Sequence, residues 1–290
     1  PRGIELAGAH LYVADGIGGL KIFDVAQPEK IALVGRLPTF DAHDVEVRWP
    51  WAYVADGPAG LMIADIRAPI APEYLTQLDL NGDSQRLNEA IVVESLFQYS
   101  RPVAKDERPT DQRTRARNLC AVLDRRLGLY LVDVTEPGLP EILHPTVNER
   151  SRAEPETNIY YRGLALLSQI DLADPQGGTR TAERDYAYVL FERDNGQSQR
   201  SQVSILDVSD PTRVPRRDPQ RVVAGFSTEQ LVVADYYSYP TRRRIAFTTG
   251  ELGAYLGDVS NSREPAQVGA LPGLTNCFAL ALEEFPLDRM

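Results

Sequence analysis

The residues best suited to chemistry in this sequence are His, Asp, Glu and Arg side chains near the start of successive predicted strands. His43 and Asp44 are adjacent, and Asn88 and Glu89 form a similar pair further along the chain. Imidazole and carboxylate groups can hold a metal ion or transfer protons, and guanidinium groups can bind a small anion. If the fold brings these positions together at a channel mouth, the candidate ligand-binding residues are Arg2, His43, Asp44, Asn88, Glu89, Arg162 and Glu229.

A second candidate is a calcium site between Asp79 and Asp83. Asp79, Asn81 and Asp83 place side-chain oxygens at alternate positions, as the beginning of an EF-hand loop does. However, Ser84 stands where that loop needs glycine, and Ala90 stands where it needs a bidentate glutamate. We therefore expect a turn here, with calcium as the weaker alternative and no other cofactor.

The sequence offers little for nucleophilic or haem chemistry. It has three histidines, and the segments around His10 and His144 are not predicted to lie near His43. There is no Gly-x-Ser-x-Gly elbow, glycine-rich phosphate loop or Cys-x-x-Cys-His run. A Ser-His-Asp or multi-His centre is hard to assemble from this set, so the balance favours a protein without catalytic activity.

Composition narrows the class of protein. The 290 residues carry a formal charge of -10, which argues against broad binding of nucleic acid. A hydrophobic content of 43% excludes wholesale disorder, and apolar runs such as 278–282 are far shorter than a membrane span. Cys120 and Cys277 are too few for a disulfide framework, and their spacing neither proves nor excludes one bridge.

An internal repeat organises the chain. Tyr-Val-Ala-Asp, then Gly-Leu-x-Ile-x-Asp, then Pro occupies residues 11–28, and the pattern returns with small changes over 52–69. A third copy spans 121–137, and looser copies span 186–211 and 245–259. About four short strands per 40 residues is the size of a β-propeller blade.

One aspartate marks the same place in every copy. It closes the second motif and recurs at intervals of 41, 68, 74 and 51 residues, as Asp24, Asp65, Asp133, Asp207 and Asp258. Equivalent positions, one per blade, lie far apart and cannot form a single site. We expect these carboxylates to accept backbone N–H groups in the turn that follows each strand.

The stretch AYVADGPAGLMIADI, followed by Pro69, resembles the LVIVD-repeat family of β-propellers. The resemblance implies an all-β propeller of four-stranded antiparallel blades. It also implies an interaction platform on secreted or surface proteins, in some cases attached to anchors or multihaem chains, without a shared catalytic motif. A location outside the cytoplasm (periplasmic, secreted or cell-surface) follows from the same resemblance.

Five complete blades and the first strand of a sixth are expected in one domain over 1–290. The preferred interpretation is that the chain is part of a longer protein. The alternative is that the last strand packs against the first blade to finish a small ring. The expected blades are about 1–38, 39–80, 81–147, 148–224 and 225–271, with a partial sixth over 272–290.

Long connections between the first two strands of the later blades are the most distinctive feature. They are expected over about 95–118, 168–185 and 236–244, on one face of the propeller. Two of them are rich in Arg and Tyr, which are enriched at protein interfaces. The candidate partner-binding residues are Arg101, Lys105, Arg108, Arg113, Arg115, Arg117, Tyr236, Tyr237, Tyr239, Arg242, Arg243 and Arg244.

Two hypotheses for the function remain open. The first is a non-catalytic scaffold that binds a protein partner or itself through these connections, docked on a surface or multihaem assembly. The second is a small-ligand- or metal-binding enzyme that uses the polar residues at the channel mouth.

Overall fold

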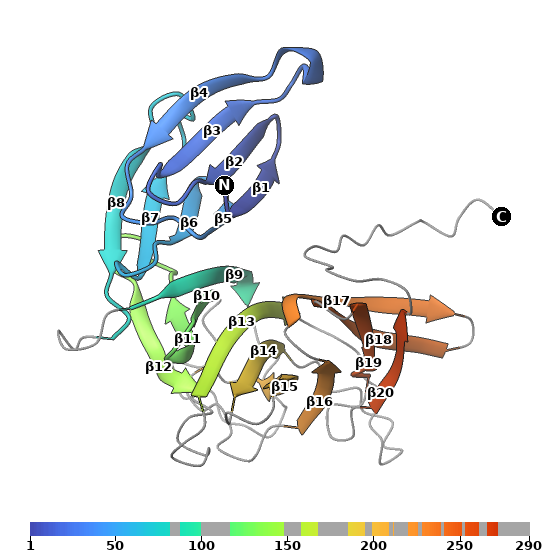
Figure 1. Ribbon diagram of the computed structural model, residues 1–290. Coiled ribbons are helices and arrows are strands. Elements are labelled where there is room, and N and C mark those ends of the chain that lie inside the picture. Colours follow the sequence, from blue (N-terminus) through green and yellow to red (C-terminus); the bar gives the residue numbers. More distant parts are fainter. Residues whose placement is uncertain are drawn as a thin grey trace, which may run out of the picture. The chain divides into compact units, whose positions relative to one another are not determined.

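The computed structural model of the protein consists mainly of β-strands, formed by short runs with a two-residue alternation between turns that contain Gly, Asp and Pro. The structure describes residues 1–81, 88–99, 117–147, 158–167, 185–194, 199–208, 211, 220–225, 228–238, 241–250, 253–260 and 266–271. Within these ranges, the strands form five four-stranded antiparallel sheets, each built from consecutive strands (Figure 1). The expected all-β class is confirmed. None of the described segments is a helix long and apolar enough to span a bilayer.

We call the sheets blades one to five and their strands a to d in chain order. Blade one holds β1 (Gly3–Ala7), β2 (His10–Ala14), β3 (Leu20–Asp24) and β4 (Ala32–Leu37), with a 3-10 turn at Pro28–Lys30. Blade two holds β5 (Asp44–Arg48), β6 (Trp51–Ala55), β7 (Leu61–Asp65) and β8 (Glu73–Leu78). Blade three holds β9 (Ala90–Tyr99), β10 (Arg117–Asp124), β11 (Gly128–Asp133) and β12 (Glu141–Val147).

The remaining two blades follow the same order. Blade four holds β13 (Asn158–Leu167), β14 (Tyr186–Asp194), β15 (Gln199–Asp207) and β16 (Gln220–Gly225). Blade five holds β17 (Thr228–Ser238), β18 (Thr241–Gly250), β19 (Gly253–Asp258) and β20 (Ala266–Leu271). The first strand expected for a sixth blade, within residues 272–290, lies outside the described residues.

The chain divides into two compact units. The first holds residues 1–151 and 209–214 and contains blades one to three. The second holds residues 152–208 and 215–290 and contains blades four and five. Each unit has its own buried core and is described by itself.

Face-to-face packing of neighbouring blades makes the core of the first unit. We call the face of each blade that meets the next blade its back face, and the opposite one its front face. In blade one, strands b and c present an apolar, buried back face, which packs on a front face of blade two made largely of valine and alanine. The back-face residues are Tyr12, Ala14, Leu20 and Ile22, and those they meet include Val45, Val47, Ala52 and Val54.

The next interface repeats this arrangement because the sequence repeats. The back face of blade two carries Tyr53, Ala55, Leu61 and Ile63, the same four residue types as blade one. It packs on a front face of blade three that includes Val93, Cys120, Val122 and Tyr130. Cys120 is a free, fully buried thiol, and Cys277 lies outside the described residues. In the second unit, a cluster of the same kind joins blade four to blade five through Tyr188, Leu190, Leu231 and Val233.

Two glycines of the repeat are required by close backbone contacts. Gly19 and Gly60 begin the Gly-Leu motif in blades one and two, with φ values of +74° and +87°. A Cβ atom at these positions would lie 2.4 Å and 2.3 Å from the carbonyl oxygens of Leu37 and Leu78. The strand-d backbone therefore leaves no room for a side chain there.

The segment 236–244 was expected to be a connecting loop, and this expectation is wrong. β17 continues to Ser238 and β18 begins at Thr241, so most of the segment is antiparallel hairpin. Tyr and Thr favour strands, and the cross-strand register simply continues past the usual end of the blade. Arg244 is accordingly buried in β18, where its Nη1 donates to the Tyr188 hydroxyl at 3.2 Å.

The predicted turn role of the repeated aspartates is confirmed for Asp24, Asp65, Asp133 and Asp258. Oδ1 of Asp24 accepts the backbone N–H of Ala26 at 2.9 Å. Asp65, Asp133 and Asp258 accept N–H groups two residues further on, at 2.9 to 3.0 Å. Each carboxylate thus supplies an acceptor that fixes the turn from strand c toward strand d.

Replacing Asp24 with alanine should destabilise the protein by about 1 kcal/mol, the typical value of one hydrogen bond. Asp24→Asn keeps a side-chain oxygen at the same place and should restore most of that loss. Urea unfolding of both variants measures the effect, with the exposed Glu29→Ala as the matched control. Equal stability of Asp24→Ala and the control would contradict the turn role.

Candidate functional site

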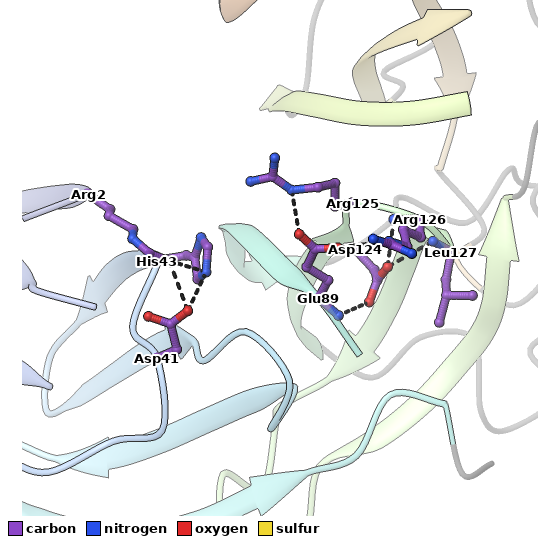
Figure 2. A network of polar contacts seen from close by, with 8 residues as sticks. All are labelled: Arg2, Asp41, His43, Glu89, Asp124, Arg125, Arg126 and Leu127. Atoms are coloured by element: carbon purple, nitrogen blue, oxygen red, sulfur yellow. Dashed lines mark hydrogen bonds and ion pairs between the residues drawn. The ribbon is translucent and has the colours of Figure 1, made fainter. Parts of the chain in front are cut away.

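The first group of polar residues among the candidates for the channel mouth joins blades one and two (Figure 2). Arg2 precedes β1, and His43 precedes β5. Oδ2 of Asp41 lies 3.0 Å from Arg2 Nη1 and 3.1 Å from His43 Nε2, and Arg2 Nη1 also contacts His43 Nε2. The structure therefore brings together two of the predicted residues around a carboxylate that the sequence analysis did not select.

Asp41 is held in place through its backbone. Its N–H and that of Phe40 donate to the two carboxylate oxygens of Asp56, at 2.8 Å and 3.0 Å. Asp56 is the buried aspartate of the Tyr-Val-Ala-Asp motif, and Gln77 Nε2 donates to it at 3.1 Å. The repeat motif thus fixes the segment that leads into the inner strand.

His43 is set up to be a neutral imidazole. Burial and the positive charge of Arg2 lower its pKa, and hydrogen bonding to Asp41 opposes this shift without cancelling it. Arg2 can only donate to Nε2 and the Asp41 carboxylate can only accept from it. The tautomer that suits one partner therefore opposes the other, and the choice between them depends on the charge around the ring.

A second group of the same kind lies on blade three (Figure 2). Glu89 Oε1 lies 2.8 Å from Arg125 Nε in an ion pair, and Glu89 Oε2 accepts a hydrogen bond from Arg126 Nε at 3.1 Å. The Glu89 N–H donates to Asp124 Oδ2 at 2.6 Å, and Asp124 Oδ1 accepts the N–H groups of Arg126 and Leu127 at 2.8 Å. Glu89 is therefore the equivalent of Asp41, a carboxylate placed by the motif aspartate of its own blade. The charge of Arg125 also lowers the pKa of His43.

Asn88 and Glu89, which the sequence suggests as a pair similar to His43 and Asp44, do not lie level with them in the neighbouring blade. Gly57 bridges Ala90 as Gly16 bridges Ala42, so the residues level with His43 and Asp44 are Ile91 and Val92. The segment before β9 differs in length from the one before β5, and an alignment by residue type cannot detect that shift. Asn88 is buried, and its Nδ2 donates to Asp79 Oδ1 at 2.7 Å.

The segment at Asp79 has the geometry of a turn. Asp79 Oδ1 accepts the Asn81 N–H at 3.0 Å in addition to the Asn88 amide. Asp83 lies outside the described residues. In the part of the chain that the structure describes, no three His, Cys, Asp or Glu side chains are grouped to hold a metal ion.

The other predicted site residues lie as follows. Arg162 is in β13, with Nη2 3.1 Å from Glu192 Oε2. Glu229 is in β17, but its side chain is outside the description. Of the partner-binding set, Arg117, Tyr236, Tyr237, Arg242 and Arg243 are placed by strand register alone. The residues outside the described ranges are Arg101, Lys105, Arg108, Arg113, Arg115 and Tyr239.

Sequence reasoning missed a set of inner-strand carboxylates. Glu5, Glu46 and Glu94 occupy the same register position in β1, β5 and β9, opposite Tyr12, Tyr53 and Ala121. These three inner strands lie next to one another in order. The sequence does contain a signal for these carboxylates. When the inner strands are aligned by their pairing with the Tyr-Val-Ala-Asp strand, the residue opposite the first position of that motif is glutamate in all three blades.

Polar contacts tie two of the inner strands together at this level. Ser95 Oγ donates to Glu46 Oε1 at 2.8 Å, and Arg48 Nε donates to Ser95 Oγ at 2.9 Å. Arg48 Nη2 lies 2.8 Å from Glu46 Oε1, and the Val93 N–H donates to Asp44 Oδ2 at 3.1 Å. Glu46, Ser95 and Arg48 thus form a small bridge between blades two and three.

Burial and mutual repulsion make these carboxyl groups hard to ionise. Burial, together with the nearby charges of Glu46 and Asp44, raises the pKa of Glu94 to about 8 against the lowering effect of Arg48. Burial raises the pKa of Asp44 to about 7 despite its backbone hydrogen bonds. The pKa values of Glu5 and Glu46 are raised for the same main reason.

Comparison with known proteins identifies the repeat. The LVIVD repeat matches residues 2–39 and 41–77, which are blades one and two. The chain therefore carries LVIVD repeats there, and the resemblance seen in the sequence is confirmed. No curated protein matches the chain.

The fold is similar to that of a solved protein from Lactobacillus plantarum. The TM-score is 0.53 with 13% sequence identity, over 94% of this chain and 71% of that one. This likeness supports a β-propeller fold. Two others score lower: Saccharomyces cerevisiae Sqt1 (0.41, 9% identity, 94% of this chain, 85% of that one) and the designed protein Ika8 (0.34, 9%, 98% and 90%).

The titration of His43 should report the balance around its ring. Arg2→Ala removes a neighbouring positive charge and should raise the pKa of His43, while Asp41→Asn should lower it. NMR titration of the ring protons measures both shifts, with His10 as an internal control. Shifts of the same sign in the two variants would contradict the arrangement.

The inner-strand carboxylates should make stability fall as pH rises. Glu94 has an ordinary value of 4.5 and about 8 in the folded protein, so folding retains a proton between these values and stability is lost as pH rises through them. Glu94→Gln cannot ionise, so it should melt several degrees above the parent at pH 8 and level with it at pH 4. One kcal/mol corresponds to roughly 2–4 °C in a chain of this size.

Thermal melts across that pH range test the effect, with the exposed Glu29→Gln as the matched control. A parent protein whose stability rises between pH 5 and pH 8 relative to Glu94→Gln would show that Glu94 is ionised in the fold.

Proposed function

From the LVIVD repeats and the β-propeller fold, we propose that this protein is a non-catalytic scaffold that binds a protein partner through lengthened a–b hairpins. The observation that carries the proposal is the length and composition of these hairpins in blades three and five. Strands a and b have five residues each in blades one and two. In blade three they have 10 and 8 residues, and in blade five 11 and 10.

The added length lies at the a–b turn and pairs tyrosine with arginine. In blade three, the register continues beyond Leu96 and Leu119 until Tyr99 is opposite Arg117. In blade five, Tyr236 is opposite Arg243, and the next rung pairs Tyr237 with Arg242. The same pair of residue types therefore occupies corresponding ends of two hairpins in separate units.

This composition suits a protein partner. Tyr and Arg give large contact areas and directed hydrogen bonds, and they are over-represented among the residues that dominate binding energy. A hairpin fixes the spacing of the backbone positions that carry such residues, so less entropy is lost on binding than from a disordered loop. From the resemblance to the LVIVD-repeat family, we also propose that the protein works in an extracytoplasmic or surface assembly.

A second candidate function rests on the polar groups of the first unit. Arg2 and Arg126 are well exposed beside Asp41 and Glu89, respectively, and His43 contacts Arg2 and Asp41. A carboxylate or phosphate group of a ligand in the place of Asp41 or Glu89 would make the same contacts with the guanidinium groups of these arginines. Under this alternative, the end of the first unit binds a small anion, and His43 responds to the anion's charge.

A hairpin variant tests the leading proposal. Tyr236, Tyr237, Arg242 and Arg243 are all changed to serine, and the tagged protein is recovered from the cells that make it. For a partner protein that the parent retains, the amount retained by the variant should fall at least tenfold. This fall corresponds to a loss of about 1.4 kcal/mol in binding free energy. Quantitative mass spectrometry measures the retention, and sedimentation velocity detects self-association.

The matched control changes Tyr74 and Arg36, which are exposed on outer strands, to serine. Retention of the same partners by the hairpin variant as by the control would contradict the proposal. Anion binding, measured by calorimetry with citrate and with inorganic phosphate, should be unaffected by the hairpin changes. Its loss in Arg2→Ala would support the second candidate instead.

A further inference from the structure

The a–b turn of blade two carries different side chains from that of blade one on the same backbone pairing. In both blades two residues join strand a to strand b. The N–H of the residue after strand c donates to the second of them, at 2.8 Å in blade one and 2.9 Å in blade two. The sequence is Ala-Gly-Ala-His over residues 7–10 and Arg-Trp-Pro-Trp over residues 48–51. Blade one therefore shows that this turn forms without tryptophan or arginine.

The turn that follows strand c differs between the blades in the same way. The repeated aspartate accepts the N–H two residues further on in blades one, two and three, and the residue at that place is Ala26, Arg67 and Thr135, respectively. The hydrogen bond comes from the backbone, so it does not depend on the side chain. The guanidinium of Arg67 is therefore not needed to form this turn.

Arg67 is held in a fixed position beside Trp51. Its Nε lies 3.1 Å and 2.9 Å from the two carboxylate oxygens of Asp65, which its Nη2 also contacts. Its Cζ lies over the Trp51 ring, 5.8 Å from the centroid. The Arg67 side chain is 69% exposed and that of Asp65 is 14% exposed, so the positive group faces solvent. A guanidinium fixed in this way loses little further entropy when it binds a second carboxylate.

A second arginine has the same arrangement at the other side of the turn. Arg48 Nη2 lies 2.8 Å from Glu46 Oε1, and the two side chains are 44% and 11% exposed. Trp49, the next residue in the chain, is 63% exposed. Both tryptophans of the chain are in this place. We call the four side chains the Trp-Arg surface: Arg48, Trp49, Trp51 and Arg67.

The charge of the Trp-Arg surface indicates what it can bind. Its two guanidinium groups face solvent, and the carboxylates that hold them are the less exposed partners. The chain as a whole has a formal charge of -10. An outward positive surface on an acidic protein is complementary to an acidic partner. Exposed tryptophan and arginine are also the residue types that most often dominate the binding energy of a protein interface.

We propose that the Trp-Arg surface binds an acidic segment of a partner protein, with carboxylate side chains on the two arginines and an apolar side chain on Trp49. The surface lies at the a–b end of blade two, the same end as the lengthened hairpin of blade three. Arg48 Nε donates to Ser95 Oγ on β9, the first strand of that hairpin, at 2.9 Å. The inference rests on the proposed function in taking the partner to be a protein, and it adds the chemistry of the segment that is bound.

Intrinsic tryptophan fluorescence reports on this surface alone, because the chain has no other tryptophan. A displayed library of random peptides is selected on the parent protein, and the selected peptides are titrated against it. They should contain more Asp and Glu than the starting library and change the fluorescence saturably. Their affinity for Trp49→Ala with Arg67→Ala should be at least tenfold weaker. This variant should melt with the parent, since blade one has glycine and alanine at the two places, and Trp51 still reports binding.

The matched control is Tyr74→Ala with Arg36→Ala, which removes an exposed aromatic residue and an exposed arginine from outer strands. It should bind the selected peptides as the parent does. Selected peptides without an excess of acidic residues, or equal affinities of the two double variants, would overturn the inference. Self-association of the parent that is lost in Trp49→Ala with Arg67→Ala, measured by sedimentation velocity, would show a second copy as the occupant and also overturn it.

Recovery of the tagged protein from its own cells separates this inference from the proposed function. The expected result is that the hairpin variant and Trp49→Ala with Arg67→Ala both lose the same partner. Loss in the hairpin variant alone would overturn the inference and leave the hairpin proposal intact. Loss in Trp49→Ala with Arg67→Ala alone would support the Trp-Arg surface and contradict the role of the hairpins. Full retention by both variants would contradict both.

Discussion

Every part of the first unit depends on the packing of one blade's back face on the front face of the next. A four-stranded sheet of this size cannot bury both of its faces by itself, so the repeat is stable only when its neighbours cover it. Tyr53, Leu61 and Ile63 do this for blades two and three, as their equivalents do for blades one and two. The interior is therefore a series of similar interfaces, and each added blade extends it.

This packing also decides where polar groups can stand. The b-strand aspartates Asp56 and Asp124 sit at the ends of buried strands, where their oxygens accept the N–H groups of the segments that lead into the inner strands. Those segments carry Asp41 and Glu89, which in turn hold arginines of the first unit. A structural motif thereby fixes two charged groups that a functional site can use.

The buried carboxyl groups of the inner strands destabilise the fold, and the apolar packing between blades must offset this effect. Glu46 and Glu94 lie on neighbouring strands at one level, so burial and repulsion both disfavour their charged forms. Arg48 and Ser95 satisfy one of these carboxylates directly. The sequence repeat accounts for this repulsion, because a glutamate tolerated in one blade recurs at the same position of the next blade and so lies beside the first one.

The sequence by itself determined the blades, the turn role of Asp24 and Asp65, and the apolar pattern of each strand, because these depend on local periodicity and short-range hydrogen bonds. Only the tertiary structure decided that Asp41, not Glu89, neighbours His43, and that Arg244 is buried in a hairpin. Those outcomes depend on the lengths of the segments before each inner strand and on how far a hairpin register continues. Residue type does not encode either quantity, since both are set by contacts between strands distant in the chain.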